Sequence, residues 1–264
     1  MAEDWEKYKI FDHPAIQRFL FYPRRDDYQA IDSETVLNLE LPVNDDIKIS
    51  CSFFFVNKTD PNLLFFHGNG ELAREYMEVG AAFNHVGINL FVADYRGYGR
   101  SGGNPSVSSM IKDAQGVFGG FKKTLKDRGF TGSHFIMGRS LGSASAIELA
   151  AGCQDQFKGL IIESGFCDVT DLLARMGLKM QPPGQSDSIS PGLESLAKIS
   201  LPILVIHGQY DSIVLLTEGE KIYSNVGSRD KKMVVIPGAD HNTIFAEGMD
   251  LYLKELSSFV DRLK

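Results

Sequence analysis

Ser140 lies in a Gly-x-Ser-x-Gly motif, Gly138–Gly142, between an apolar run and a helix-forming run. A serine hydroxyl is a useful nucleophile only when it is exposed, held still and set beside a base. A sharp turn from a strand into a helix meets the first two needs, and its crowded backbone requires glycines. Glycine-rich turns also match so short a motif by chance. The strand–turn–helix context favours a nucleophile at Ser140, with the Leu141 N–H at the helix start donating to an oxyanion.

A serine nucleophile also needs a general base. His241 follows the last expected strand in a loop, late in the chain, and this position favours a catalytic role over that of a merely solvated histidine. His13 and His85 are expected at the surface. His134 and His207, at the start and end of strands, are expected to be structural.

The base needs an acid that orients it. Asp211 follows the next-to-last expected strand, which gives the chain order Ser140, Asp211, His241. This is the order expected for a nucleophile elbow on an α/β sheet. Glu163 and Asp168, after the preceding strand, remain alternative acids.

A glycine-rich loop, His67–Gly70, closes one strand and opens a helix. Its glycines allow the backbone to approach a ligand, so the Asn69 N–H can point to the same place as that of Leu141. A simple strand–helix turn would have the same composition. In company with the elbow, the loop predicts an oxyanion site formed by the backbone of Asn69 and Leu141.

A second glycine-rich loop, Asp94–Gly103, lacks the spacing and the Lys-Ser/Thr end of a phosphate-binding loop. We interpret it as a tight excursion that braces the site, with Asp94 and Arg96 as internal partners. No His, Cys, Asp or Glu cluster has metal-ligand spacing. The sequence therefore predicts no metal site.

The elements that position these residues alternate from residue 63 onward between short apolar runs and helical patterns. This alternation predicts a parallel sheet covered by helices on both faces, and a preceding hairpin adds an antiparallel N-terminal edge. The expected strands are Val36–Leu41, Ile47–Val56, Leu63–Phe66, Ile88–Ala93, Phe135–Met137, Leu160–Ile162, Ile203–Ile206 and Lys232–Ile236. The expected helices are Glu71–Val86, Val107–Arg128, Ala144–Ala151, Glu218–Asn225 and Met249–Leu263.

The chain has 264 residues, which suits one α/β domain over residues 36–264. Residues 1–35 are expected to form an arm that lies over the core. The segment 167–200 is irregular and leaves a strand end on the same edge as Ser140, so we expect a small lid or pocket wall there. It contains apolar residues at helical spacing, then Pro182–Gly184 and a serine-rich stretch.

The formal net charge of −7 argues against a nucleic-acid partner. Three separated cysteines predict no disulfide framework. The acidic N-terminus is not a signal peptide, and no run approaches the ~20 apolar residues of a transmembrane helix. These features predict a cytoplasmic location. The oligomeric state does not follow from them.

Six segments together resemble the α/β-hydrolase superfamily, and most closely its Bem46-like, or membrane-associated, serine hydrolases. The likeness spans residues 36–263 and rests on His67–Gly70, Asp94–Ser101, Gly138–Ser143, Ile161–Glu163, Asp211 and His241-Asn242.

The resemblance implies that Ser140 is the nucleophile, His241 the general base and Asp211 the orienting acid, with Asn69 and Leu141 as oxyanion donors. It implies hydrolysis of an ester, thioester or similar acyl bond through an acyl-enzyme, without a cofactor. Many such proteins carry an N-terminal membrane anchor, which this sequence does not show. The lid is where they differ most, so their substrates do not transfer.

The leading hypothesis is therefore a serine hydrolase for small or medium acyl substrates. A serine peptidase or amidase would use the same residues. A non-catalytic binding protein is the other alternative, but it would have no need of Ser140, Asp211 and His241 together. Dehalogenase and epoxide-hydrolase chemistry would need an acidic residue in place of Ser140. For Arg139 the sequence predicts no role beyond that of an ion-pair partner.

Overall fold

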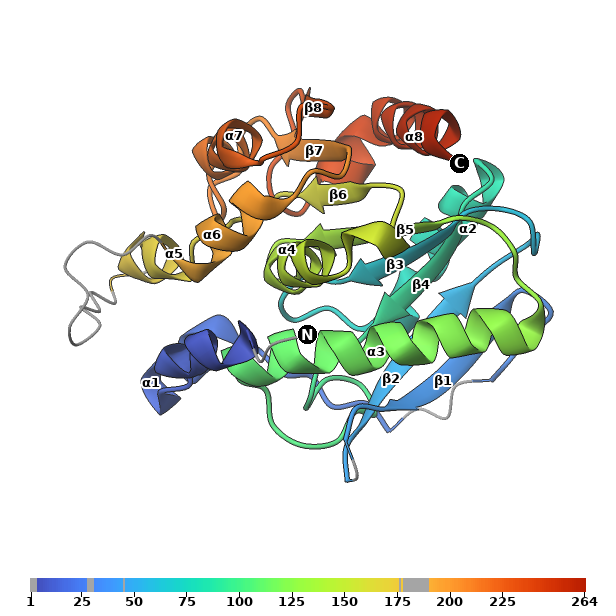
Figure 1. Ribbon diagram of the computed structural model, residues 1–264, viewed down its shortest axis with the longest axis horizontal. Helices are drawn as coiled ribbons and strands as arrows, with labels where there is room; N and C mark the ends of the chain where they lie inside the picture. Colours follow the sequence, from blue (N-terminus) through green and yellow to red (C-terminus); the bar gives the residue numbers. More distant parts are fainter. Residues whose placement is uncertain (1–3, 28–30, 45, 176, 178–189) are drawn as a thin grey trace.

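A single sheet runs through the part of the protein that the structure, a computed structural model, describes (Figure 1). It has eight strands in the order β1-β2-β4-β3-β5-β6-β7-β8. The hairpin of β1 and β2 pairs antiparallel with itself and with β4, and all other neighbours are parallel. The predicted mostly parallel sheet with an antiparallel N-terminal edge is confirmed. The structure describes residues 4–27, 31–44, 46–175, 177 and 190–264.

The central strands are apolar on both faces because helices cover both. In β3 and β4 every residue is buried, whereas in the edge strand β8 only Val234 and Ile236 are buried. The strands are β1 (Val36–Pro42), β2 (Lys48–Phe54), β3 (Asn62–Phe66), β4 (Asn89–Ala93), β5 (His134–Arg139), β6 (Leu160–Glu163), β7 (Ile203–Gly208) and β8 (Lys231–Ile236).

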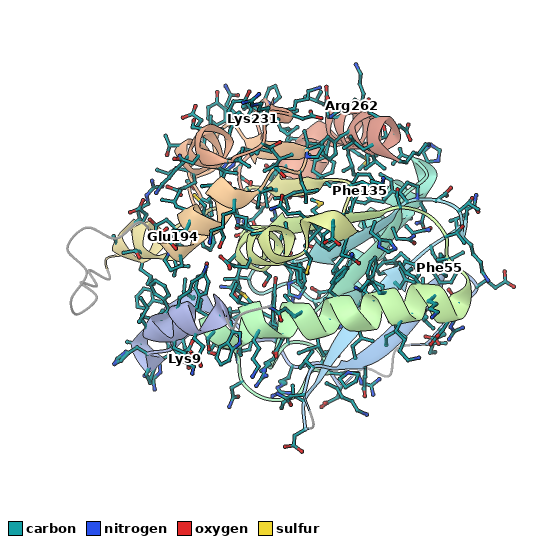
Figure 2. All side chains as sticks on the ribbon, viewed as in Figure 1. Lys9, Phe55, Phe135, Glu194, Lys231 and Arg262 are labelled. Carbon is teal, nitrogen blue, oxygen red and sulfur yellow. The ribbon has the colours of Figure 1, made fainter. Side chains whose placement is uncertain are left out.

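Two apolar layers flank the sheet. The larger contains side chains from η1, α1, α3, α4, α6 and α7, and the smaller contains those from α2 and α8. Figure 2 shows Phe135 inside the molecule, while Lys231 and Arg262 lie at its rim. The elements are η1 (Asp4–Phe11), α1 (Pro14–Leu20), η2 (Ala73–Tyr76), α2 (Met77–His85), α3 (Val107–Arg128), α4 (Gly142–Gly152), η3 (Gln154–Gln156), α5 (Val169–Arg175), α6 (Pro191–Lys198), α7 (Leu216–Asn225) and α8 (Ile244–Leu263).

The helix α3 has the predicted bounds because both of its ends carry caps. Ser106 forms a capping box at the start, and Gly129 ends the helix in the left-handed region with φ of 74°. The prediction was less accurate for two other helices. The segment from Glu71 begins with loop and the 3-10 turn η2, and α8 begins at Ile244 with a kink at Gly248.

The N-terminal residues contribute to the larger apolar layer. Tyr8, Phe11, Ile16 and Leu20 are each at most 4% exposed. The chain then passes over the loop after β3, where the Tyr22 N–H donates to Asn69 Oδ1 at 2.7 Å. The N-terminal segment therefore packs extensively on the core.

The predicted lid begins and ends in helices. The short α5 follows β6, and α6 packs against α4 and α7. In Figure 1, α5 extends away from the sheet beyond the ends of β6 and β7. Met176 and the Pro182–Gly184 stretch lie outside the described residues.

Candidate active site

The turn from β5 into α4 has the strained geometry that the motif predicts. Ser140 has a φ of +49°, and its N–H donates to the Glu163 carbonyl of β6 at 2.9 Å. A Cβ at Gly142 would lie 2.0 Å from the Phe66 carbonyl oxygen of β3. One at Gly138 would lie 2.5 Å from the Gly142 oxygen. Only glycine fits these two positions, and the turn lifts Ser140 out of the strand.

Three side chains from different strand ends meet at this turn. His241 Nε2 lies 2.9 Å from Ser140 Oγ, and His241 Nδ1 lies 2.7 Å from Asp211 Oδ2. A carboxylate can only accept, so Nδ1 carries the proton and Nε2 is free to accept from the serine hydroxyl. All three side chains are at least nine-tenths buried. The structure thus brings together the three residues that the sequence singled out.

Asp211 is held by the backbone that follows it. Its Oδ1 accepts hydrogen bonds from the N–H groups of Ile213 at 3.0 Å and Val214 at 2.8 Å. Burial alone would raise the pKa of Asp211, but the hydrogen bonds that its carboxylate accepts from His241 and from the Val214 N–H outweigh burial and lower that pKa below its ordinary value. Asp211 therefore stays ionised and keeps His241 in the tautomer described above.

The two alternative acids, Glu163 and Asp168, bind groups other than the His241 imidazole. Glu163 binds the Arg139 guanidinium at 2.7 Å and accepts from the Tyr252 hydroxyl at 2.7 Å. Asp168 accepts from the Thr170 N–H at the start of α5, at 2.8 Å. In this geometry Asp211 is the carboxylate on the imidazole.

The loop His67–Gly70 lies beside the elbow because β3 and β5 are neighbours in the sheet. Leu141 is the N-cap of α4, so its N–H belongs to the helix end that favours anions. The Asn69 side chain accepts from the Tyr98 hydroxyl at 2.6 Å as well as from the arm. These contacts fix the loop whose backbone is the predicted second oxyanion donor.

A buried histidine supports that loop from inside. His67 Nδ1 lies 2.7 Å from the Gly68 carbonyl, and Nε2 lies 3.1 Å from Asp94 Oδ1. Burial would lower the pKa of His67, but Asp94 outweighs it and raises that pKa. The Arg96 guanidinium binds Asp113 of α3 through two bonds, at 2.6 and 2.8 Å. Asp94 and Arg96 are thus internal partners, as predicted, although not of each other.

Two contributors to the site were not found from the sequence. Glu71 Oε2 accepts from the Gly68 N–H at 2.8 Å, and its Oε1 accepts from Arg139 at 2.9 Å. The signal in the sequence that could have indicated this contact is the position of the Glu71 carboxylate three residues after Gly68. Ser164, directly after β6, adopts a φ of +43°, and its hydroxyl is buried without a hydrogen-bond partner among the described residues. Nothing in the sequence around Ser164 indicates either property.

A nucleophile elbow on a mostly parallel eight-stranded sheet, with acid and base after later strands, defines the α/β hydrolases. The chain belongs to one family of this class, described as serine aminopeptidase, S33, whose model matches residues 57–183 and 188–248. Among the described residues, no helix has the length and apolar character needed to cross a bilayer.

Individual proteins are similar to the chain over most of its length. Protein bem46 of Schizosaccharomyces pombe is 29% identical over 211 residues, which cover 76% of this chain and 67% of bem46. The esterase Pf2001 of Pyrococcus furiosus has a TM-score of 0.69 at 18% identity, over 90% of this chain and 99% of that one. A soluble variant of the Saccharomyces cerevisiae monoglyceride lipase has a TM-score of 0.66 at 18% identity, with the same coverage. The predicted Bem46-like resemblance is confirmed.

Proposed function

We propose that the protein is a serine hydrolase that cleaves a carboxylic ester or thioester of a small or medium acyl substrate through an acyl-enzyme. The observation that carries this proposal is the pair of hydrogen bonds from Ser140 Oγ to His241 and from His241 to Asp211. They occur at a turn whose strained serine and two crowded glycines have no other evident use.

In the first half of the reaction, Ser140 Oγ attacks the acyl carbon while its proton passes to His241 Nε2. Asp211 stabilises the imidazolium that forms and stays ionised itself. The backbone N–H groups of Asn69 and Leu141 donate to the oxyanion. When the tetrahedral intermediate collapses, His241 gives its proton to the leaving alcohol or thiol, and the acyl group remains on Ser140.

In the second half, water attacks the acyl-enzyme. His241 takes a proton from that water and returns one to Ser140 Oγ as the acid product leaves. This cycle needs no cofactor and no metal. The named activities of similar solved proteins, an esterase and a monoglyceride lipase, support an ester substrate.

A serine peptidase is the second candidate, because the family description names an aminopeptidase. The same three residues would serve amide cleavage. An amine leaving group requires protonation by His241 before it departs, whereas an alkoxide or thiolate needs it less. The leaving group is therefore where the two candidates differ.

Hydrolysis of p-nitrophenyl esters from acetate to palmitate, compared with aminoacyl p-nitroanilides, tests the proposal. We expect turnover of the esters, with a maximum at one chain length that reports the depth of the acyl site. Turnover of the anilides with inert esters would favour the peptidase. A folded protein that turns over neither class would contradict the proposed function.

A further inference from the structure

The Arg139 guanidinium contacts three separate parts of the candidate site. Nε donates to Glu71 Oε1 at 2.9 Å, and Nη1 donates to Glu163 Oε1 at 2.7 Å. Nη2 donates to the backbone carbonyl of His241 at 2.9 Å. The side chain is 11% exposed. All of its nitrogens are therefore used, and each binds a different segment of the chain.

Each partner of Arg139 is connected to an atom of the proposed chemistry. Glu71 accepts from the Gly68 N–H, in the loop that carries the oxyanion donor. The Glu163 backbone carbonyl accepts from the Ser140 N–H. The third partner is the carbonyl of the base, His241, itself. One guanidinium thus links the oxyanion loop, the nucleophile and the base.

We propose that Arg139 is a positioning residue that holds the His241 loop and the oxyanion loop in reacting geometry around Ser140. This inference rests on the proposed function and concerns the same site. Arg139 touches no reacting atom. It acts through the His241 carbonyl and through Glu71, and its loss moves the base relative to the nucleophile. A misplacement of about 1 Å is enough to slow an enzyme on the order of 100-fold.

The chemistry of the partners explains why an arginine is needed. Glu71 and Glu163 would repel one another without a cation between them, and the His241 carbonyl accepts a third N–H from the same side chain. A guanidinium supplies five N–H groups in a fixed planar fork, whereas an ammonium is a point charge. Burial would lower the pKa of Arg139, but Glu163 and Glu71 outweigh it, so the side chain stays charged.

The surroundings of Arg139 allow a test by chemical rescue. A cavity of about 260 Å³ lies between α2 and α8, and Arg139, Glu71, Glu163 and Asn242 are among its lining residues. The Glu71 side chain is 27% exposed, so the network can be reached from solvent. Truncation of Arg139 would leave a hole that a free guanidinium ion can enter.

The experiment measures the rate of acylation by a fluorophosphonate probe in wild type and in Arg139→Ala. We expect the variant to react about 100-fold more slowly. Guanidinium chloride at millimolar concentration should recover a large part of that rate, whereas urea and sodium chloride should not. Recovery by guanidinium alone is a result that a purely structural role would not give.

Two further variants guard against a failure to fold. Arg139→Lys keeps the charge between the carboxylates but loses the planar fork, so we expect a folded protein with reduced kcat and nearly unchanged KM. Phe118→Ala removes a buried aromatic ring of α3, which packs on Phe157 away from the base loop. It should lower the melting temperature without changing the acylation rate of the folded protein.

Arg139→Ala or Arg139→Lys reacting at the wild-type rate would overturn the inference. So would a slow Arg139→Ala whose loss matches its unfolded fraction and does not respond to guanidinium. A wild-type protein that is folded but inert to the probe would instead overturn the proposed function. The two failures are therefore distinguishable.

Discussion

Three carboxylates surround the candidate site, and their contacts assign them different roles. Asp211 binds His241, Glu163 binds Arg139, and Glu71 joins Arg139 to the loop His67–Gly70. Asp211 and Glu163 each come at or after the end of a parallel strand, so the sequence offered both as acids. Only the geometry of the loops distinguishes them. For the same reason, the three-way contact of Arg139 could not be predicted from the sequence.

Asp211→Asn should lower kcat on the order of 10⁴-fold, because an amide no longer holds His241 in the reactive tautomer. The fold should be unaffected, since the shapes of the two side chains are the same. Ester hydrolysis and a thermal melt together check this. Asp240→Asn is the matched control, because Asp240 is exposed and an asparagine can make the same turn contacts. A nearly silent Asp211→Asn beside an inactive Glu163→Gln would contradict the assignment of the acid.

The stability of the protein should fall in acid partly through Glu71. Burial would raise the pKa of Glu71, but Arg139 and His67 outweigh it, so the folded-state pKa lies below the ordinary value of 4.5. A depressed carboxyl pKa stabilises the folded state above the ordinary pKa, and this contribution is lost as the pH falls through the folded-state value. Melting temperatures of wild type and Glu71→Gln should therefore converge as the pH drops below 4.5. A constant difference would show that Glu71 titrates normally.

At the scale of elements, the elbow joins β5 and α4 against the end of β3. The sequence predicted it well because glycines and a serine at fixed spacing mark a turn that few other residues can form. The bounds of α3 were predictable for a similar reason, because the residues that cap its two ends, Ser106 and Gly129, directly flank the helix in the sequence. The start of α2 was not predictable, because Glu71 and Ala73 are held by Arg139 and Asp94, which are distant in sequence.

Gly142→Ala should destabilise the fold by about 3 kcal/mol or more, because the new Cβ would lie 2.0 Å from the Phe66 carbonyl oxygen. Denaturant unfolding measures the effect. Gly119→Ala is the control: Gly119 lies within α3, and a Cβ there meets nothing within 4 Å. It should stabilise the protein by about 0.5–1 kcal/mol. Equal effects of the two changes would mean that the elbow does not pack tightly on β3.

At the scale of the whole molecule, residues 4–27 contact both the core and the loop that carries Asn69. Their pattern is polar and aromatic by turns, so the sequence indicated an arm over the core without showing which side chains are buried. The structure buries Tyr8 against the larger apolar layer, and its hydroxyl donates to Glu148 of α4 at 2.7 Å. The division into an arm, residues 1–35, and a hydrolase domain, residues 36–264, remains a prediction.

Tyr8→Ala should lower the free energy of unfolding by about 3 kcal/mol, because it removes a buried aromatic ring and leaves Glu148 without the hydroxyl. Ile10→Ala on the same 3-10 helix is the control. Ile10 is 41% exposed, so its loss should cost less than about 0.5 kcal/mol. Urea titration of both variants gives the comparison. A Tyr8→Ala protein as stable as wild type would show that the arm packs only loosely.

The central claim is that Ser140 is an activated nucleophile, and labelling by a fluorophosphonate probe tests it most directly. Wild type should be labelled covalently, and Ser140→Ala, with the same circular dichroism and melting behaviour, should not. That result would establish an activated serine at the elbow. Labelling that persists in Ser140→Ala, or a folded wild type that is never labelled, would contradict the account.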